Sequence, residues 1–253
     1  MRLATALGAL ALGAGGLTVT TLPRPAFPGP AAAPSGQHRL VLVSSHYASP
    51  GIVQSGQELR AGPDHFLGLP LEGGVNQTGR TTFAFYGRDS ASAHLILALD
   101  NITQKSRYAF DFKNYVWPPR IRPADREFVY ESVVWAHEAN GALYVENAHL
   151  TYASSSYGQN AYITAIDLKT RKALWRSPAL VANANTFLVT SHYLVTGYGF
   201  TAEPDYLYLL DRATGHVVDR LLLPNAPEKI TWQGKLLHVR TYDHNLLVRL
   251  AGA

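Results

Sequence analysis

The amino-acid sequence predicts an all-β fold assembled from repeated four-stranded units. Short apolar runs end in an Asp, which is followed three residues later by Thr and then by a second apolar run. Residues that favour strands are plentiful, with 14 Tyr and 9 Phe, whereas only 16% of the 253 residues are charged. The chain beyond its N-terminal leader carries no long apolar stripe with the 3.6-residue period of a helix. A length of 253 residues is sufficient for one all-β domain with a full core.

The strand–turn–strand pattern occurs three times, at the pairs Asp100 and Thr103, Asp167 and Thr170, and Asp211 and Thr214. The second and third copies are 44 residues apart, and self-similarity at such a period is typical of radial or stacked architectures. The Asp carboxylate of each copy is placed to accept backbone N–H groups of the following turn, and the Thr hydroxyl can do the same. We therefore predict that all six residues have a structural role in hairpin turns.

Two further positions of the repeat vary between the copies. The residue after the Thr is Gly215 in the third copy, which suits a positive φ, but Gln104 and Arg171 in the other two. Eight residues past each Asp, the first two copies have an aromatic ring, whereas the third has Asp219. A large ring at this position is expected to pack between neighbouring sheets.

The stretch from Ala165 to Trp175, which reads AIDLKTRKALW, resembles the quinoprotein-type (PQQ-like) β-propeller repeat. The core of that repeat reads roughly Ala-x-Asp-x-x-Thr-Gly-x-x-x-Trp. Residues 207–218 resemble the same repeat without its Trp, and residues 95–110 resemble it more weakly. The resemblance implies a β-propeller, but it specifies a blade and not an activity, because such blades occur in dehydrogenases, envelope scaffolds and binding proteins.

Alternating and apolar segments predict the strands in order. They are residues 39–45, 65–71, 81–86, 94–99, 107–112, 128–136, 142–147, 161–166, 173–176, 186–190, 193–198, 206–210, 216–223, 229–232, 235–240 and 245–250. Strict grouping in fours gives four blades, and a degenerate blade around residues 52–60 would make five. Only three strands remain after residue 223, so we expect residues 39–45 to supply the missing strand and close the ring.

The first 37 residues predict export rather than fold. Arg2 supplies a positive charge, residues 3–22 carry no charge, and five prolines follow between residues 23 and 34. This pattern fits a signal peptide or an uncleaved anchor, followed by a Pro-rich tether, with one propeller domain over residues 38–253. The expected location is secreted, periplasmic or at the cell envelope. Because the sequence has no Cys, it forms no disulfide and has no Cys for lipid attachment.

The candidate binding residues lie in two irregular loops, residues 113–123 and 151–160. These loops lengthen the interval between Asp100 and Asp167 to 67 residues, and long loops on a rigid scaffold tend to carry binding groups. The candidates are the aromatic and basic residues Tyr115, Trp117, Arg120, Arg122, Tyr152 and Tyr157. Such residues are frequent anchors at interfaces, so we expect a protein or an acidic polysaccharide as partner. Nucleic acid is not expected outside the cell, and a membrane only through an uncleaved leader.

The sequence predicts no catalytic residue, metal or cofactor. Its 10 His are scattered without zinc-motif spacing, and no phosphate-cradling Gly loop is present. Triad residue types near His46 and His244 lack a nucleophile elbow. The densest polar group fits either satisfied strand-end residues or a metal or acid/base site. Its members are His137, Glu138, Glu146, Asn147 and His149.

Two function classes therefore remain. The first is an exported, non-enzymatic propeller that acts as a binding or scaffold module. The alternative is a propeller enzyme, either a quinone-dependent dehydrogenase or a glycan hydrolase or lyase. The dehydrogenases that the repeat resembles need a larger ring and usually a calcium site, and this chain is short for them. A propeller glycosidase needs two or three carboxylates that converge on the axis. We favour the first class.

Overall fold

The computed structural model describes residues 17–23, 39–52, 62–76, 80–89, 91–118, 121–149, 151–184 and 186–251. The regular elements among these residues are strands, apart from two short 3₁₀ helices, η1 (Pro123–Asp125) and η2 (Ala153–Ser156). The all-β class expected from the sequence is therefore the observed class.

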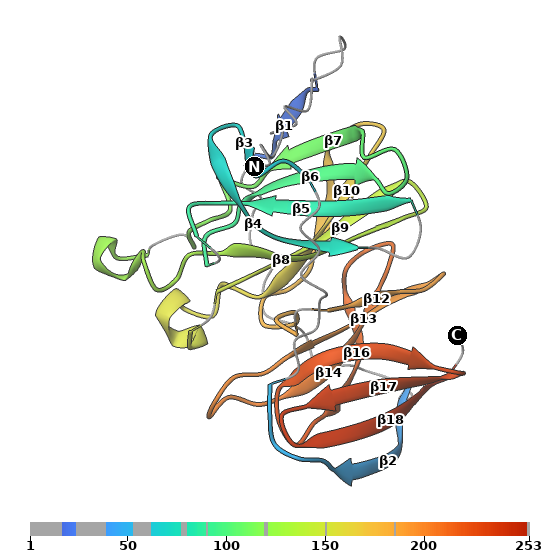
Figure 1. Ribbon diagram of the computed structural model, residues 1–253. Coiled ribbons are helices and arrows are strands. Elements are labelled where there is room, and N and C mark those ends of the chain that lie inside the picture. Colours follow the sequence, from blue (N-terminus) through green and yellow to red (C-terminus); the bar gives the residue numbers. More distant parts are fainter. Residues whose placement is uncertain are drawn as a thin grey trace, which may run out of the picture.

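The strands form four sheets, which are four blades of a β-propeller (Figure 1). The first sheet has the order β1 (Val19–Thr21), β7 (Ser106–Asp111), β6 (Leu95–Asp100), β5 (Thr81–Tyr86), β4 (Leu69–Asn76) and β3 (His65–Phe66). The second has the order β11 (Ala173–Arg176), β10 (Tyr162–Asp167), β9 (Ala142–Ala148) and β8 (Ser132–Ala139). The third has the order β12 (Leu188–Val189), β13 (Tyr193–Tyr198), β14 (Tyr206–Asp211) and β15 (Val217–Leu222). The fourth has the order β16 (Pro227–Gln233), β17 (Leu236–Thr241), β18 (His244–Leu250) and β2 (Leu40–Tyr47).

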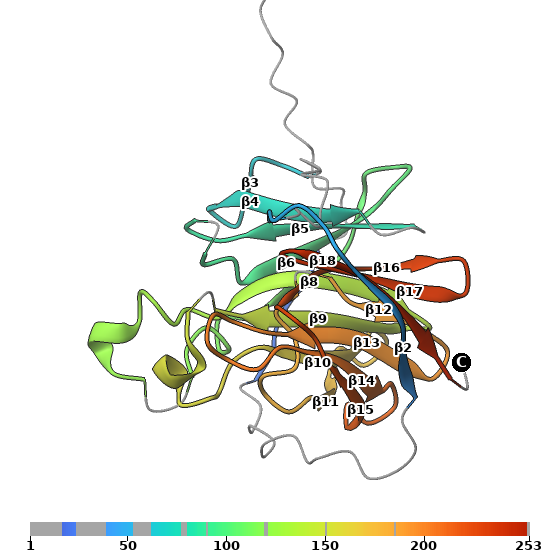
Figure 2. The ribbon, with the colours of Figure 1, turned by 90° about the horizontal axis from the view of Figure 1, so that it is seen from below.

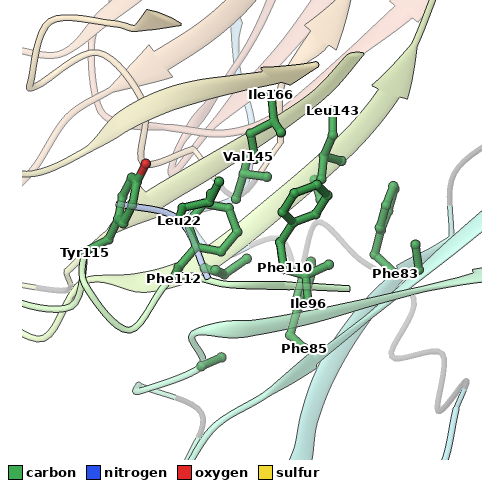
Figure 3. Close-up of a cluster of buried hydrophobic side chains, with 14 of the residues drawn as sticks. Leu22, Phe83, Phe85, Ile96, Phe110, Phe112, Tyr115, Leu143, Val145 and Ile166 are labelled. Carbon is green, nitrogen blue, oxygen red and sulfur yellow. The ribbon is translucent and has the colours of Figure 1, made fainter. Parts of the chain in front are cut away.

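Apolar side chains pack each sheet against the next one along the chain. Alternation along β10 sends Tyr162 and Ile166 toward the first sheet and Ile163 and Ala165 toward the third. Figure 3 shows the cluster between the first two sheets, in which Phe110 lies near Leu143 of β9. Buried leucines join the third and fourth sheets in the same way, and Figure 2 shows the successive sheets arranged as a fan.

Strand β2 completes the last blade, as predicted for residues 39–45. β2 pairs antiparallel with β18, in a register that runs from Leu40 opposite Leu250 to Tyr47 opposite His244. The buried carboxylate of Asp219, on β15 of the third sheet, accepts the amides of Arg39 at 2.6 Å and Leu40 at 2.8 Å. The entry of the closing strand is therefore fixed both by its own sheet and by the neighbouring one.

The position eight residues past each repeat Asp makes a hydrogen bond to the next sheet. Tyr108 donates its hydroxyl to Oε2 of Glu138 on the second sheet at 2.7 Å. The indole of Trp175 donates to the carbonyl of Arg212, in a turn of the third sheet, at 3.1 Å. At this position in the third copy, the carboxylate of Asp219 accepts the amides of Arg39 and Leu40, where the chain enters the fourth sheet. The third copy lacks the ring because its neighbour presents two backbone amides rather than a carboxylate or a carbonyl.

The three Asp–Thr turns have one geometry. Oδ1 of Asp100 accepts the backbone N–H of Thr103 at 2.9 Å and its hydroxyl at 3.0 Å. Both bonds recur in the Asp211 turn at 2.9 Å, and the Asp167 turn has the backbone bond at 2.5 Å. The residue after the Thr has φ of 56° at Gln104, 59° at Arg171 and 74° at Gly215. The turn therefore imposes a left-handed residue even where the sequence supplies no glycine.

Two predicted strands differ from those observed by more than a shift of their ends. Residues 65–71 form a hairpin, because Leu67 and Gly68 both adopt positive φ and break the segment into β3 and the start of β4. Residues 128–131 are not a strand: the amides of Phe128 and Val129 bond back to the carbonyl of Asp125, and β8 begins only at Ser132.

The N-terminal region also contributes to the first sheet. Residues 19–21, within the predicted leader, form β1 and pair with β7. Residues 53–60, on which a fifth blade depends, lie outside the described residues, and the described part of the chain forms four sheets.

Candidate functional site

Both inserted loops leave the second sheet at the same end. Ser132 at the start of β8 pairs with Ala148 at the end of β9, and Tyr162 at the start of β10 pairs with Asn147. The loop that enters β8 and the loop that joins β9 to β10 therefore lie on one rim of the propeller, and we call it the loop rim. The Asp167 turn lies at the opposite end of the same strands, on what we call the turn rim.

The two loops lie side by side on the loop rim (Figures 1 and 2). The hydrogen bond from Nε of Arg122 to Asp125, 2.6 Å long, raises the pKa of the Arg122 guanidinium, and the phenol of Tyr157 in the other loop raises it further. Arg122 and Tyr157 are thus within electrostatic range of each other. The two segments that sequence analysis selected separately form one surface.

The first loop is held by contacts around Trp117. The indole donates to the carbonyl of Arg126 at 3.3 Å, and the Arg126 guanidinium lies over the ring at 5.0 Å. Tyr130 meets the same ring edge to face at 5.7 Å. Trp117 nevertheless stays 37% exposed, and Phe128, nearby in the chain, is 69% exposed. Phe128, the more exposed of the two rings, contributes little to the core.

The second loop is tied to the third sheet. Tyr152 meets Phe200 edge to face at 5.0 Å, and the amide of Ala153 donates to Oε1 of Glu203 at 2.8 Å. Glu203 also accepts the hydroxyl of Tyr198. The loop thus has a fixed position, although Tyr152 and Tyr157 remain exposed.

A buried polar network supports the second loop from below. Nε2 of His149 lies 2.8 Å from the hydroxyl of Ser156 and 2.7 Å from Nδ2 of Asn160. The amide of Thr151 donates to Nδ1 at 3.3 Å. Burial lowers the pKa of His149 to about 4. Ser156 is fully buried and donates to the carbonyl of Ala153, so this Ser–His contact is structural rather than a nucleophile with its base.

The predicted binding residues do not all reach this surface. Trp117, Arg122, Tyr152 and Tyr157 are exposed on the loop rim. Tyr115 is a correction: its ring is buried at 3% exposure, where it packs edge to face on Phe112 at 5.1 Å, and it cannot contact a partner. Arg120 lies outside the described residues.

Sequence reasoning missed Phe128, which was assigned to a strand. The apolar sequence of Phe128, Val129 and Tyr130 is typical of a strand, and only the preceding prolines indicated an irregular segment. We define the loop surface as the exposed residues Trp117, Arg122, Phe128, Tyr152 and Tyr157.

The dense polar group around His137 does not converge on one point. Glu138 turns toward the first sheet, where it bonds to Arg107 at 2.6 Å and to Tyr108. The alternation of β9 sends Glu146 toward the third sheet and Asn147 toward the first. In the described part of the chain, no three His, Asp or Glu side chains are grouped so that they could hold a metal ion.

A row of buried polar residues crosses the second sheet beneath the first loop. Within the described residues, both amide atoms of Asn147 lack a hydrogen-bond partner, and the buried carboxyl of Glu131 lies near the backbone of Ala161. Desolvation raises the pKa of Glu131 well above its ordinary value, although the nearby Arg176 opposes this shift. The Arg176 guanidinium lies 3.2 Å from the centroid of the Tyr162 ring. These side chains have little contact with solvent, so the row belongs to the interior rather than to the surface.

Comparisons with known proteins give distant structural likenesses alone. No protein-family model and no characterised relative matches the chain. Among solved structures, the computationally designed Ika4 protein is 10% identical, with a TM-score of 0.43, over 70% of this chain and 88% of its own. BamB from Moraxella catarrhalis is 12% identical, with a TM-score of 0.38, over 72% of this chain and 58% of its own.

The quinohemoprotein alcohol dehydrogenase ADHIIG from Pseudomonas putida HK5 is 14% identical, with a TM-score of 0.41. This match covers 80% of the chain but only 30% of the dehydrogenase. At these identities and scores the likenesses do not extend to function. Within the described residues, no helix has the length and apolar character needed to cross a membrane.

Proposed function

We propose that this protein is an exported, non-enzymatic β-propeller that binds a partner protein through the loop surface. The observation that carries the proposal is the meeting of the two inserted loops, which brings exposed aromatic rings and Arg122 onto one rim. Aromatic and Arg side chains supply most of the binding energy at protein interfaces. Contacts with Arg126, Tyr130 and Phe200 hold two of these rings in place, so little conformational entropy is lost when a partner binds.

Export is supported by the uncharged N-terminal run and the prolines that follow it. The net charge of +4 and the arginines of the first loop favour a partner with an acidic surface.

The enzyme alternative has no comparable observation. Four of the described carboxylates are engaged in structure: Asp100 and Asp211 hold turns, Glu138 pairs with Arg107, and Asp219 holds β2. We therefore retain the binding module as the proposed function.

The experiment compares protein captured from source-cell envelope extracts by three baits: wild type, a Phe128→Ser, Tyr157→Ser variant, and an Ile102→Ser control. Ile102 is also exposed and apolar but lies in the Asp100 turn on the turn rim. A partner should be retained by wild type and the control and reduced at least about tenfold by the loop variant. Equal capture by all three baits would refute the loop surface as the binding site.

A second arm applies the same three proteins to an array of acidic and neutral polysaccharides. Binding there by wild type but not by the loop variant, without protein capture, would reject a protein as the partner class and place a polysaccharide on the same surface. Matched melting temperatures are required for all three proteins, because a loss of fold would imitate a loss of binding.

A further inference from the structure

A segment of the predicted leader is a strand of the folded domain. β1 adds to the outer edge of the first sheet and runs parallel to β7, with Val19, Thr20 and Thr21 opposite Ala109, Phe110 and Asp111. The amide of Leu22 continues the pairing by donating to the carbonyl of Asp111 at 3.1 Å. Figure 1 shows β1 beside β7 at this edge.

The side chain of Leu22 fills a pocket between the first two sheets. It has 0% exposure and belongs to the core cluster that includes Phe112, Tyr115 and Val145 (Figure 3). Thr21, its neighbour in the chain, is exposed, and Val19 is half-buried. One large apolar side chain thus anchors the segment, as a side-chain pocket does when a peptide adds to a sheet edge.

Two side chains outside the sheet hold the backbone of the segment. Nδ2 of Asn114 donates to the carbonyl of Leu22 at 2.8 Å, and a guanidinium nitrogen of Arg171 donates to the carbonyl of Thr18 at 2.8 Å. Both donors are directed to main-chain carbonyls, which any extended peptide presents. Arg171 also adopts a φ of 59° where the third repeat copy has Gly215. Arg171 therefore occupies a backbone conformation that favours glycine, and its side chain binds the backbone of residues 17–22.

We propose that the edge of β7, the Leu22 pocket, Asn114 and Arg171 form a strand-accepting site for an extended peptide, and that residues 17–22 occupy it in cis. Removal of the leader during export, before the domain folds, leaves the site empty. It then takes an extended segment of a partner protein, with main-chain hydrogen bonds along β7 and a large apolar residue in the Leu22 pocket. This site is on the outer edge of the first blade and does not depend on the loop surface.

The test begins with the full chain, in which residues 26–33 are replaced by a protease recognition sequence. The folded protein is cut, and the N-terminal fragment is followed by size-exclusion chromatography. The fragment should remain bound and should be displaced by a fluorescent peptide that carries residues 16–23 and a solubilising tail. A Leu22→Asp peptide should bind at least about tenfold more weakly, whereas a Thr21→Asp peptide should bind within about twofold of the parent.

A protein variant tests the backbone donor. Arg171→Gly supplies the residue of the third copy, so the turn is retained while the guanidinium is lost, and peptide affinity should fall at least about threefold.

The proposal would be overturned by a cut protein that stays folded, by near-ultraviolet circular dichroism, but binds no peptide at about 1 mM. Equal binding of the Leu22→Asp and parent peptides would also overturn it. Unfolding once the fragment has dissociated would do the same, because β1 would then be an obligatory part of the core rather than the occupant of a site.

Discussion

The two rims of the second blade are built in different ways. On the turn rim, the hydrogen bonds that close the Asp167 turn are local, such as those from Thr170 and Arg171 back to Asp167, and the same bonds recur in the Asp100 and Asp211 turns. On the loop rim, the contacts join distant segments: Ala153 bonds to Glu203, and the ring of Tyr152 meets that of Phe200. The turn rim leaves few rings exposed, whereas the loop rim exposes Phe128 and Tyr157.

This difference predicts that the turn rim contributes mainly to stability and the loop rim mainly to binding. Turn-rim residues satisfy backbone groups of their own hairpins, so substituting them should change stability first. The exposed rings of the loop rim satisfy little within the protein, so substituting them should change binding first. The predictions below test this separation and run from the largest expected effect to the smallest.

Asp219→Ala should cause the largest loss of stability. The buried carboxylate accepts the amides of Arg39, Leu40 and Arg220, and its removal leaves these donors without a partner. We expect a loss of about 3–5 kcal/mol in the free energy of unfolding, measured by urea denaturation. Asp219→Asn, which keeps one acceptor oxygen, should lose less. A loss below about 1 kcal/mol for the Ala variant would contradict the role of Asp219 in holding β2 against the third sheet.

Gly215→Ala should be costly, although the equivalent positions of the other copies carry Gln and Arg. The φ of Gly215 is 74°, and an added Cβ would lie 2.4 Å from the Trp175 ring. Backbone strain and overpacking together predict a loss of about 2–4 kcal/mol. Gln104→Ala, at the same place in a turn without a stacked Trp, is the control and should change stability little. Equal losses of stability for the two substitutions would show that the contact with Trp175 does not contribute to the free energy of unfolding.

The loop rim should lose stability in mild acid because of His149. Burial lowers its pKa in the folded protein to about 4 from an ordinary 6.5, so the unfolded chain binds the proton more tightly between these values. Stability is therefore fully present above pH 6.5 and is lost as the pH falls toward 4, by up to about 3 kcal/mol. The measurement is the difference in unfolding free energy between wild type and His149→Gln across this range. A difference that is constant with pH would refute a buried neutral His149.

The turn rim should respond only to stronger acid. Backbone hydrogen bonds from Thr103 and Thr170 are the main causes that lower the pKa of Asp100 and Asp167 below 3.8. Their contribution is present above pH 3.8 and is lost as the pH falls through the lower folded values. The difference in melting temperature between Asp167→Asn and wild type should therefore disappear only below pH 3.8. If the two melting temperatures already became equal near pH 6, the prediction would be wrong, because the turn rim would then lose stability in the range predicted for His149.

Phe128→Ser with Tyr157→Ser should have the smallest effect on stability, within about 0.5 kcal/mol for each substitution. Both rings are exposed, so little buried area is lost when they are removed. Thermal melting against wild type measures the change. A loss above about 2 kcal/mol would mean that these rings belong to the packing of the domain.

Local features of the chain allowed much of the turn rim to be predicted. The Asp–Thr spacing determines each turn through bonds within a few residues, and the strand count indicated that residues 39–45 complete the last blade. The role of Asp219 could not be read in the same way, because its partners Arg39 and Leu40 lie about 180 residues away in sequence.

The loop rim and the N-terminal strand depend on tertiary contacts that leave weak local signals. Tyr115 and Trp117 are two residues apart in one aromatic loop, yet one is buried and the other exposed, because only Tyr115 packs against Phe112. Residues 17–22 have the apolar composition of a leader, and the same composition lets Leu22 fill a core pocket.

The central claim is that the loop rim, and not the turn rim, contacts a partner. The most direct measurement places a photo-crosslinking amino acid at Tyr157 in one strain of the source cells and at Ile102 in another, with illumination in vivo. Both positions are exposed, so both report on what approaches them. The account predicts a discrete adduct with one protein from position 157 and none from position 102. An adduct from position 102 alone, or the same adducts from both positions, would contradict it.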